Sequence, residues 1–176
     1  MVKICLLFGT VAALAIAPLA AVDAAVLGPD AAQCASGSGP AVLVRVTGLK
    51  NRAGKLRART FAGAKPSSWF NRKMALKRTE VDIPDSGPIE ICMAVPAVGG
   101  YVVDLRHDVN NNGDTDKSDG AGASGNPTIS MFDFLLGRKP PASKVVIQIP
   151  EGVVAISVVM KYIQGGSLKP IQVTAR

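Results

Sequence analysis

Short apolar segments separated by turn residues limit the folds open to this chain more than any other feature. Segments of four to eight residues recur along it, each bounded by residues such as Gly, Pro, Asp or Asn. Residues 41–47 are an example, because valine occupies every second position, the period of a strand with one buried face. Short strands with a turn about every ten residues are typical of two packed antiparallel sheets. We therefore expect an all-β fold, an antiparallel β-sandwich of seven or eight strands.

The first predicted hairpin joins residues 41–49 to residues 55–61 through the turn KNRAG. In its second strand, Arg57 and Arg59 share the face opposite Leu56, because side chains alternate along a strand. We expect both arginines on the solvated side of the hairpin. Further strands are predicted at residues 79–84, 89–95, 100–107, 144–150 and 152–163, with an edge strand at 168–173.

One short helix is predicted at residues 69–78. Phe70, Met74 and Lys77 recur there at helical spacing, and Ser68 is available as the N-cap. The aromatic pair formed by Trp69 and Phe70 is expected to cover one end of the core.

The first 24 residues have the pattern of a secretory signal peptide. Lys3 precedes an apolar run, and small residues continue to Ala24, where cleavage is expected. A retained membrane anchor is the alternative, but Pro18 interrupts a run that is short for a bilayer span. No lipobox precedes Cys34. We expect a periplasmic or secreted protein whose mature chain has no transmembrane segment.

The remaining chain is long enough for one domain with its own core. Residues 25–40 are rich in Gly, Ser and Ala, and we expect a flexible N-terminal segment there, followed by the β-sandwich domain at residues 41–176. Removal of residues 1–24 takes away Lys3 and Asp23, so the 20 basic and 13 acidic residues become 19 and 12, and the formal charge stays at +7.

Two cysteines remain after the signal peptide, because Cys5 lies within it. An even pair in an exported chain favours a disulfide between Cys34 and Cys92. The alternative is two buried free thiols. A bridge would tether residues 25–40 to the domain.

The stretch HDVNNNGDTDKSDG, from His107 to Gly120, has the spacing of a calcium-binding loop. Such loops place oxygen ligands at positions 1, 3, 5, 7, 9 and 12 and glycine at position 6. Counting from Asp108 puts Gly113 at position 6. The metal ligands expected at the six positions are Asp108, Asn110, Asn112, Asp114, Asp116 and Asp119.

The alternative for this loop is a metal-free turn whose side-chain oxygens bond its own backbone. Position 12 is Asp119 rather than the longer Glu, and the segment before the loop is a predicted strand, so a helix-loop-helix sensor is not expected. Crowding of aspartates favours a bound cation, since only Arg106 and Lys117 are close in sequence to offset them. We expect calcium as a structural ion.

Two segments carry a resemblance to a known family. They are VPAVGGYVVDLRHDVNNNGDTD, residues 95–116, and VRVTGLKNRAGKLRARTF, residues 44–61. Together they resemble domain-of-unknown-function family 2141 of exported bacterial proteins, over roughly residues 40–164. The glycine-tyrosine strand start is similar to that of transthyretin-like and immunoglobulin-like sandwiches. The resemblance implies export, a β-sandwich and an ion, but no substrate.

Basic residues gather in one part of the chain. Eleven of the 20 lie between Arg45 and Arg78, with no acid among them. A solvated face is one interpretation, and contact with an anionic envelope component through residues 45–78 is the other. A nucleic-acid partner is not expected, because stacking aromatic residues and a recognition helix are missing.

The sequence contains no recognisable catalytic motif. The only histidine, His107, neighbours Asp108, but adjacent strand residues point to opposite faces. A zinc site would need cysteines that are expected to be bridged. The leading hypothesis is therefore an exported, non-catalytic β-sandwich protein with a calcium loop at residues 108–119. An adhesive or anionic-polymer-binding module is the alternative, and a periplasmic enzyme the third hypothesis.

Overall fold

The structure is a computed structural model that describes residues 25–171 except 129, 131, 134 and 135. The expected signal peptide, residues 1–24, lies outside the described residues. Eleven strands are present in the described part: β1 (Val26–Leu27), β2 (Ala41–Thr47), β3 (Lys55–Ala62), β4 (Lys77–Asp82), β5 (Ile89–Ala94), β6 (Gly99–Asp108), β7 (Gly120–Ala123), β8 (Ile147–Ile149), β9 (Val153–Val159), β10 (Lys161–Gln164) and β11 (Ser167–Pro170). The helical elements are α1 (Ala31–Ser36), α3 (Ala142–Val145) and the 3-10 turns η1 (Pro66–Ser68) and η2 (Arg72–Met74).

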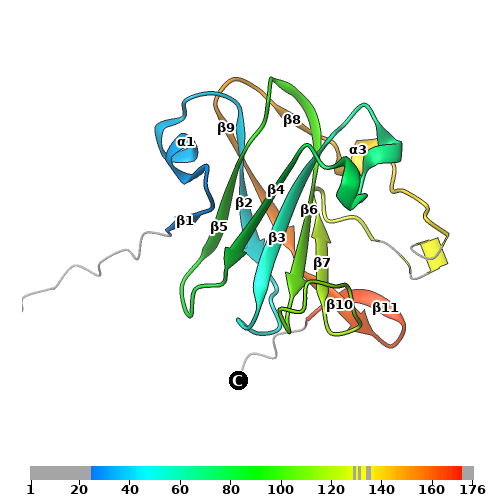
Figure 1. Cartoon of the computed structure of the whole chain (residues 1–176). Helices are drawn as coiled ribbons and strands as arrows, with labels where there is room; N and C mark the ends of the chain where they lie inside the picture. The colour runs from blue at the N-terminus through cyan, green and yellow to red at the C-terminus, as the bar shows by residue number, and fades with distance from the viewer. Residues whose placement is uncertain (1–24, 129, 131, 134–135, 172–176) are drawn as a thin grey trace, which may run out of the picture.

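The strands form two sheets, which confirms the predicted all-β sandwich (Figure 1). One sheet has the strand order β1-β5-β2-β9, and the other has the order β11-β10-β7-β6-β3-β4, with β8 pairing the start of β6. The number of strands exceeds the predicted seven or eight because several are only two to four residues long. Pairing is mixed rather than purely antiparallel, since β2 and β9 run parallel, as do β1 and β5. Within the described residues, no helix is long and apolar enough to cross a membrane.

The main core lies between the two sheets. Val42, Val44 and Val46 of β2 point into it from the four-stranded sheet, and Leu56 and Ala58 of β3 point into it from the other. The period-two pattern of the sequence therefore identified the buried faces correctly.

One extended segment contributes to both sheets. β9 pairs with β2 in the four-stranded sheet, and β10 pairs with β7 and β11 in the seven-stranded sheet. Met160, the residue between them, is fully buried, and its N–H donates to the carbonyl oxygen of Thr47 at 2.8 Å. The apolar pattern of residues 152–163 predicts one strand and gives no sign of the change of sheet at Met160.

The segment at residues 25–40, expected to be flexible, instead contains β1 and α1, as the left side of Figure 1 shows. β1 pairs with β5, and a disulfide joins Cys34 of α1 to Cys92 of β5, as predicted. No residue of α1 is buried. The disulfide therefore holds α1 against the sheet, because α1 has no buried side chain that could do so.

Asp30 ties this segment to both sheets. Its carboxylate accepts the N–H of Ala94, at the end of β5, at 2.8 Å and forms an ion pair with Lys77 of β4. Burial raises the pKa of Asp30, but the bonds from Lys77 and Ala94 outweigh burial and hold the pKa below its ordinary value. A carboxyl group whose pKa is lowered on folding stabilises the folded state most when it is ionised in both states.

We expect Asp30→Asn to lower the free energy of unfolding by about 1–2 kcal/mol above pH 5, because the ion pair is lost while one oxygen still accepts the Ala94 N–H. The difference from wild type should shrink as the pH falls below about 4, through the lowered pKa, because Asp30 then becomes protonated in the wild type as well. Urea unfolding of both proteins across this pH range measures the difference. A difference that stays constant with pH would contradict the ion pair.

The helix predicted at residues 69–78 is wrong. The chain instead makes the two 3-10 turns η1 and η2, and Phe70 between them has φ of 64°, which breaks any helix. Trp69 is buried on the outer face of the seven-stranded sheet, in a second apolar cluster with Phe61, Val102 and Val145. Of the residues at helical spacing, only Phe70 packs against this cluster, since Met74 is exposed and Lys77 pairs with Asp30. Trp69 does not cover the end of the main core.

Candidate functional site

The candidate site is the loop between β6 and β7, residues 109–119, together with the last residue of β6, Asp108. Gly113, at position 6 of the calcium pattern, has φ of 85°, a conformation that glycine adopts without strain. Asn111 has φ of 54°, in the left-handed region that asparagine tolerates better than most residues. These two residues turn the loop sharply, which brings Asn110 and Asn112 close to Asp116.

Three of the six predicted ligands converge. The side-chain amides of Asn110 and Asn112 donate to Oδ2 of Asp116 at 2.7 and 3.1 Å. The other oxygen of Asp116 accepts the hydroxyl and N–H of Ser118 at 2.5 and 2.7 Å. Led by the bond from the Ser118 hydroxyl, these bonds lower the pKa of Asp116 to about 2. The side chains at positions 3, 5 and 9 of the calcium pattern are therefore in direct contact with one another through Asp116.

Asp108, at position 1, is fully buried and bonded on both oxygens. Oδ2 accepts from Nη2 of Arg57 at 2.7 Å and from the N–H of Gly113 at 2.9 Å. Oδ1 accepts the N–H of Asn112 at the longer distance of 3.2 Å. Arg57 also donates to the Gly113 carbonyl at 2.8 Å. Asp108 therefore anchors the loop to the neighbouring strand β3.

Asp119, at position 12, is buried and more loosely held. Its Oδ2 lies 3.4 Å from both Nε and Nη2 of Arg106, and its Oδ1 accepts the N–H of Val109 at 3.3 Å. Asp114, at position 7, is exposed, and its N–H donates to Oδ1 of Asn112 at 2.9 Å. The aspartates at the two ends of the loop thus pair with arginines, whereas the side chains in its middle bond to other residues of the loop.

The six predicted ligands are of the chemical type that calcium prefers, but only some of them lie close enough together to bind one ion. All six residues can offer oxygens, the ligands that calcium prefers. In the described part of the chain, however, no three Asp, Glu, His or Cys side chains come together as a metal-binding group. The amides of Asn110 and Asn112 turn their nitrogens toward Asp116, whereas a cation there would need their oxygens, which a half-turn of each amide would bring inward.

Arg57 is the important residue that sequence reasoning placed incorrectly. It was expected on a solvated face, but its guanidinium is buried and bridges Asp108 to Glu80 of β4, at 2.7 and 2.6 Å. The strand register explains this, since Glu80, Arg57 and Arg106 lie side by side on β4, β3 and β6. Arg59, one pair further along, forms two bonds of 2.8 and 2.5 Å with buried Asp104.

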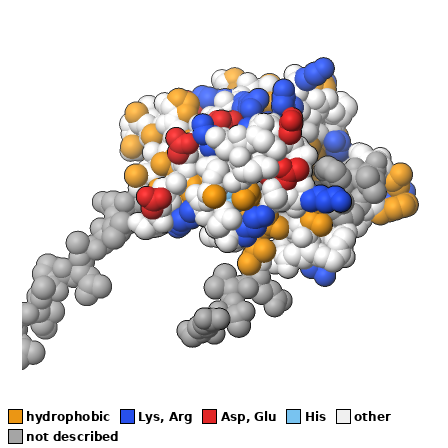
Figure 2. Space-filling model, turned by 60° about the horizontal axis from the view of Figure 1, so that its bottom comes forward, with side chains coloured by type: hydrophobic (Ala, Val, Ile, Leu, Met, Phe, Trp, Pro, Cys, Tyr) orange, Lys and Arg blue, Asp and Glu red, His pale blue; other side chains and the backbone are white. Residues whose placement is uncertain are grey.

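The basic hairpin is therefore largely neutralised. Six of the eleven basic residues between positions 45 and 78 form ion pairs: Arg45, Lys55, Arg57, Arg59, Lys77 and Arg78. Figure 2 shows basic and acidic side chains interspersed on the lower end of the sandwich rather than gathered by sign. Much of the positive charge of residues 45–78 is therefore offset by acidic side chains within the fold.

His107 is enclosed. Its Nε2 lies 2.7 Å from the carbonyl oxygen of Ala53, which requires a proton on Nε2, and its Nδ1 then accepts the hydroxyl of Tyr162 at 2.6 Å. Burial lowers the pKa of His107, which favours this neutral form. The ring therefore joins β6 to β10 and to the loop after β2.

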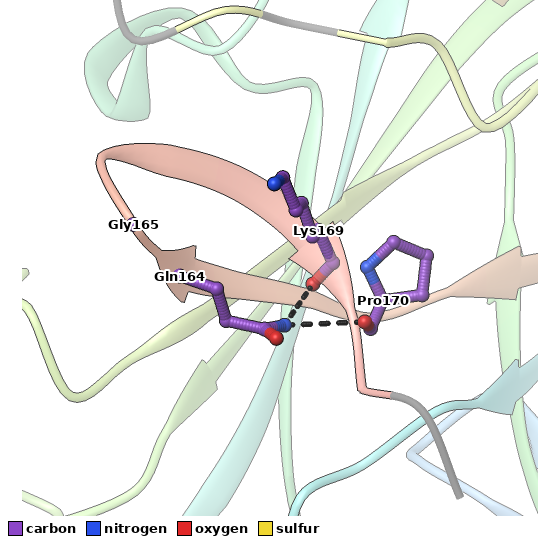
Figure 3. A pocket seen from close by; sticks show the side chains of 4 residues that line it. All are labelled: Gln164, Gly165, Lys169 and Pro170. Carbon is purple, nitrogen blue, oxygen red and sulfur yellow. Dashed lines mark hydrogen bonds between the residues drawn. The ribbon is translucent and has the colours of Figure 1, made fainter.

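The described residues form hollows on the surface, and two of these lie outside the candidate loop. One, of about 510 Å³, lies at the hairpin of β10 and β11, where the Gln164 amide donates to the carbonyl oxygens of Lys169 and Pro170 at 3.0 and 3.1 Å (Figure 3). The Gln164 amide thus stabilises the β10–β11 hairpin, and the side chain of Lys169 points away from this amide. The other hollow, of about 570 Å³, is bordered by the cations Arg138, Lys139 and Lys144.

Comparison with known protein families gives one match. The family described as "Uncharacterized protein conserved in bacteria (DUF2141)" matches residues 44–157, which is more than half of the chain. The chain belongs to this family. The match includes both segments on which the resemblance was based, and it runs from β2 into β9, so the family unit includes the loop at residues 108–119. Neither the curated proteins nor the solved structures give a match.

Proposed function

We propose that this DUF2141 protein is an exported, non-catalytic β-sandwich whose loop at residues 108–119 binds calcium as a structural ion. The observation that supports this most is the convergence of Asn110, Asn112 and Asp116 around a turn with glycine at position 6. Calcium accepts six to eight oxygen ligands in a flexible arrangement, which suits short side chains on a turn.

The arginines at the two ends of the loop limit the role of the ion. Arg57 uses Oδ2 of Asp108 and leaves Oδ1 with the weaker Asn112 contact, so one oxygen remains able to face an ion. Because Arg57 and Arg106 already offset two aspartates, calcium would stiffen a loop that holds its shape without it. We infer that the ion would stabilise the existing loop conformation and would not switch the loop between two conformations.

The proposed export rests on the signal-peptide pattern of residues 1–24, and the non-catalytic role rests on His107. Its two ring nitrogens are engaged in the interior, so the ring cannot serve as a general base for a bound substrate.

Calcium is expected to raise the melting temperature of residues 25–176 by roughly 3–6 °C at ten times its dissociation constant. The linkage relation gives about 1.4 kcal/mol at that concentration. The dissociation constant should be about 10⁻⁴ to 10⁻³ M, as in other extracellular modules, because Asp119 is shorter than the usual Glu. Melts in chelator, calcium and magnesium measure this. Magnesium should have little effect, since it requires a tighter octahedron and retains its waters.

Asp116→Asn is the best variant, because Asp116 lies at the point of convergence and its replacement leaves Asp108 and Arg57 in place. It should abolish most of the calcium increment. Asp85→Asn is the matched control, since it removes one exposed carboxylate outside the loop and should keep the increment. Coincident melts of the wild type in calcium and chelator up to about 10 mM, ten times the weakest dissociation constant in the expected range, would refute the site.

A further inference from the structure

Several of the basic residues that form no ion pair among the described residues lie beside the second apolar cluster. Lys65, Arg72 and Lys73 lie on the segment of η1 and η2, and all three are exposed. Lys139 and Lys144 approach from the other side, and Nζ of Lys139 lies 5.4 Å from the ring centre of Phe70. Figure 1 shows the segment before β4 next to α3 at the upper right of the molecule. Five cations thus border one part of the surface.

Large apolar side chains are exposed on the same segments. Met74 is 37% exposed and Leu76 is 51% exposed, next to Arg72 and Lys73. Outside these segments, Phe132 is 64% exposed, and the guanidinium of Arg138, which also pairs with Asp133 at 3.5 Å, lies 5.8 Å from its ring centre. An exposed apolar group surrounded by cations is the pattern of side chains that enter the boundary between lipid headgroups and acyl chains.

The backbone holds this segment in one conformation. Phe70 has φ of 64°, which is unfavourable for an aromatic residue and persists only where its surroundings enforce it. The surroundings here are Trp69, whose indole N–H donates to the Ala62 carbonyl at 3.0 Å, and Phe61, whose ring meets Phe70 edge to face. The strained turn directs the following residues, 72–74, away from the sheet and into solvent.

We propose that this surface, formed by residues 65–76 and 138–144, binds a bilayer of anionic phospholipid. The cations would meet the headgroup phosphates, and Met74 and Leu76 would enter the interfacial layer. The hollow of about 570 Å³ is lined by Arg138, Lys139 and Lys144. Asp133 also lines it and pairs with Arg138, so Lys139 and Lys144 are the cations left to reach the same headgroups. This surface lies apart from the loop at residues 108–119, so binding does not require calcium.

Sedimentation with vesicles tests the proposal, using residues 25–176 in chelator, because this part of the chain contains every element described. The wild type should bind vesicles of equal parts phosphatidylglycerol and phosphatidylcholine, bind pure phosphatidylcholine far less, and lose binding as salt rises. Arg72→Gln with Lys73→Gln should weaken partitioning about thirtyfold, since each cation near an anionic surface contributes about fivefold. Met74→Ser with Leu76→Ser should weaken it at unchanged salt dependence.

The matched control is Lys117→Gln with Lys169→Gln, which removes two exposed cations elsewhere and leaves the same net charge. This control should partition nearly as the wild type does. Equal loss in both double variants would show attraction by net charge alone and would overturn the proposal, as would equal sedimentation of the wild type with both kinds of vesicle. Unchanged melting temperatures show that the variants are folded, since all four positions in the proposed surface are exposed.

Discussion

Replacing Asp108 by Ala should lower the free energy of unfolding by about 3–5 kcal/mol, even in chelator. Removal of one partner of a buried ion pair leaves the other charge without compensation. Here Arg57 would keep only one carboxylate partner, the partly exposed Glu80, beside its bond to the Gly113 carbonyl, and the N–H groups of Asn112 and Gly113 would lose the Asp108 oxygens as acceptors. Chemical denaturation of residues 25–176 in chelator measures the loss.

A double-mutant cycle separates the ion pair from the rest of the loop. In an Arg57→Met background, Asp108→Ala should be less costly than in the wild type, because no buried guanidinium is left unpaired. Additive effects would show that the two residues do not interact. A loss that appears only in calcium would assign Asp108 to the ion rather than to Arg57.

Loss of the disulfide should destabilise the protein by a similar amount, about 4 kcal/mol in the chain-entropy model. Cys34 and Cys92 are separated by 58 residues, so the bridge closes a long loop of the unfolded chain. Guanidinium unfolding with and without reductant should show this shift, and the double variant Cys34→Ala, Cys92→Ala should match the reduced wild type.

Loss of the disulfide should also increase the hydrogen exchange of nearby backbone amides. Because α1 buries no side chain, its amides should exchange rapidly with solvent once the bridge is absent, while the amides of β2 stay protected. An unchanged unfolding midpoint after reduction would contradict a stabilising role. Rapid exchange in β2 as well would show that the bridge supports the whole core.

The strands that were predictable are those whose own pattern matches their environment. In β2 and β3 one face is buried and apolar, so alternation reveals them. β7 was missed because its sequence, GAGA, has little strand propensity. A side chain at Gly120 would approach Tyr162 to 2.5 Å, and one at Gly122 would approach Val158 to 2.7 Å. The small residues of β7 are required by neighbours that a local pattern cannot show.

The sequence predicted which residues of the loop come together, but not which residues of other strands contact the loop. The spacing of Asn110, Asn112 and Asp116 identified side chains that do meet. The counter-charges came from a strand some fifty residues earlier, since Arg57 reaches Asp108 only through the pairing of β3 with β6. Strand register depends on the whole fold, so the estimate of unbalanced charge made from nearby residues was too high.

The pairing of β2 with β9 has a consequence for the nascent chain. β2 begins at Ala41 and its parallel partner begins at Val153, so more than a hundred residues must be made before the two can meet. Non-local pairing of this kind slows folding, because the loop must close before any contact forms. Until the last third of the chain has been synthesised, the four-stranded sheet lacks its edge, and Met160 cannot close the core. The polypeptide therefore cannot close its core until most of the chain has been synthesised, an unfolded interval that suits the proposed export.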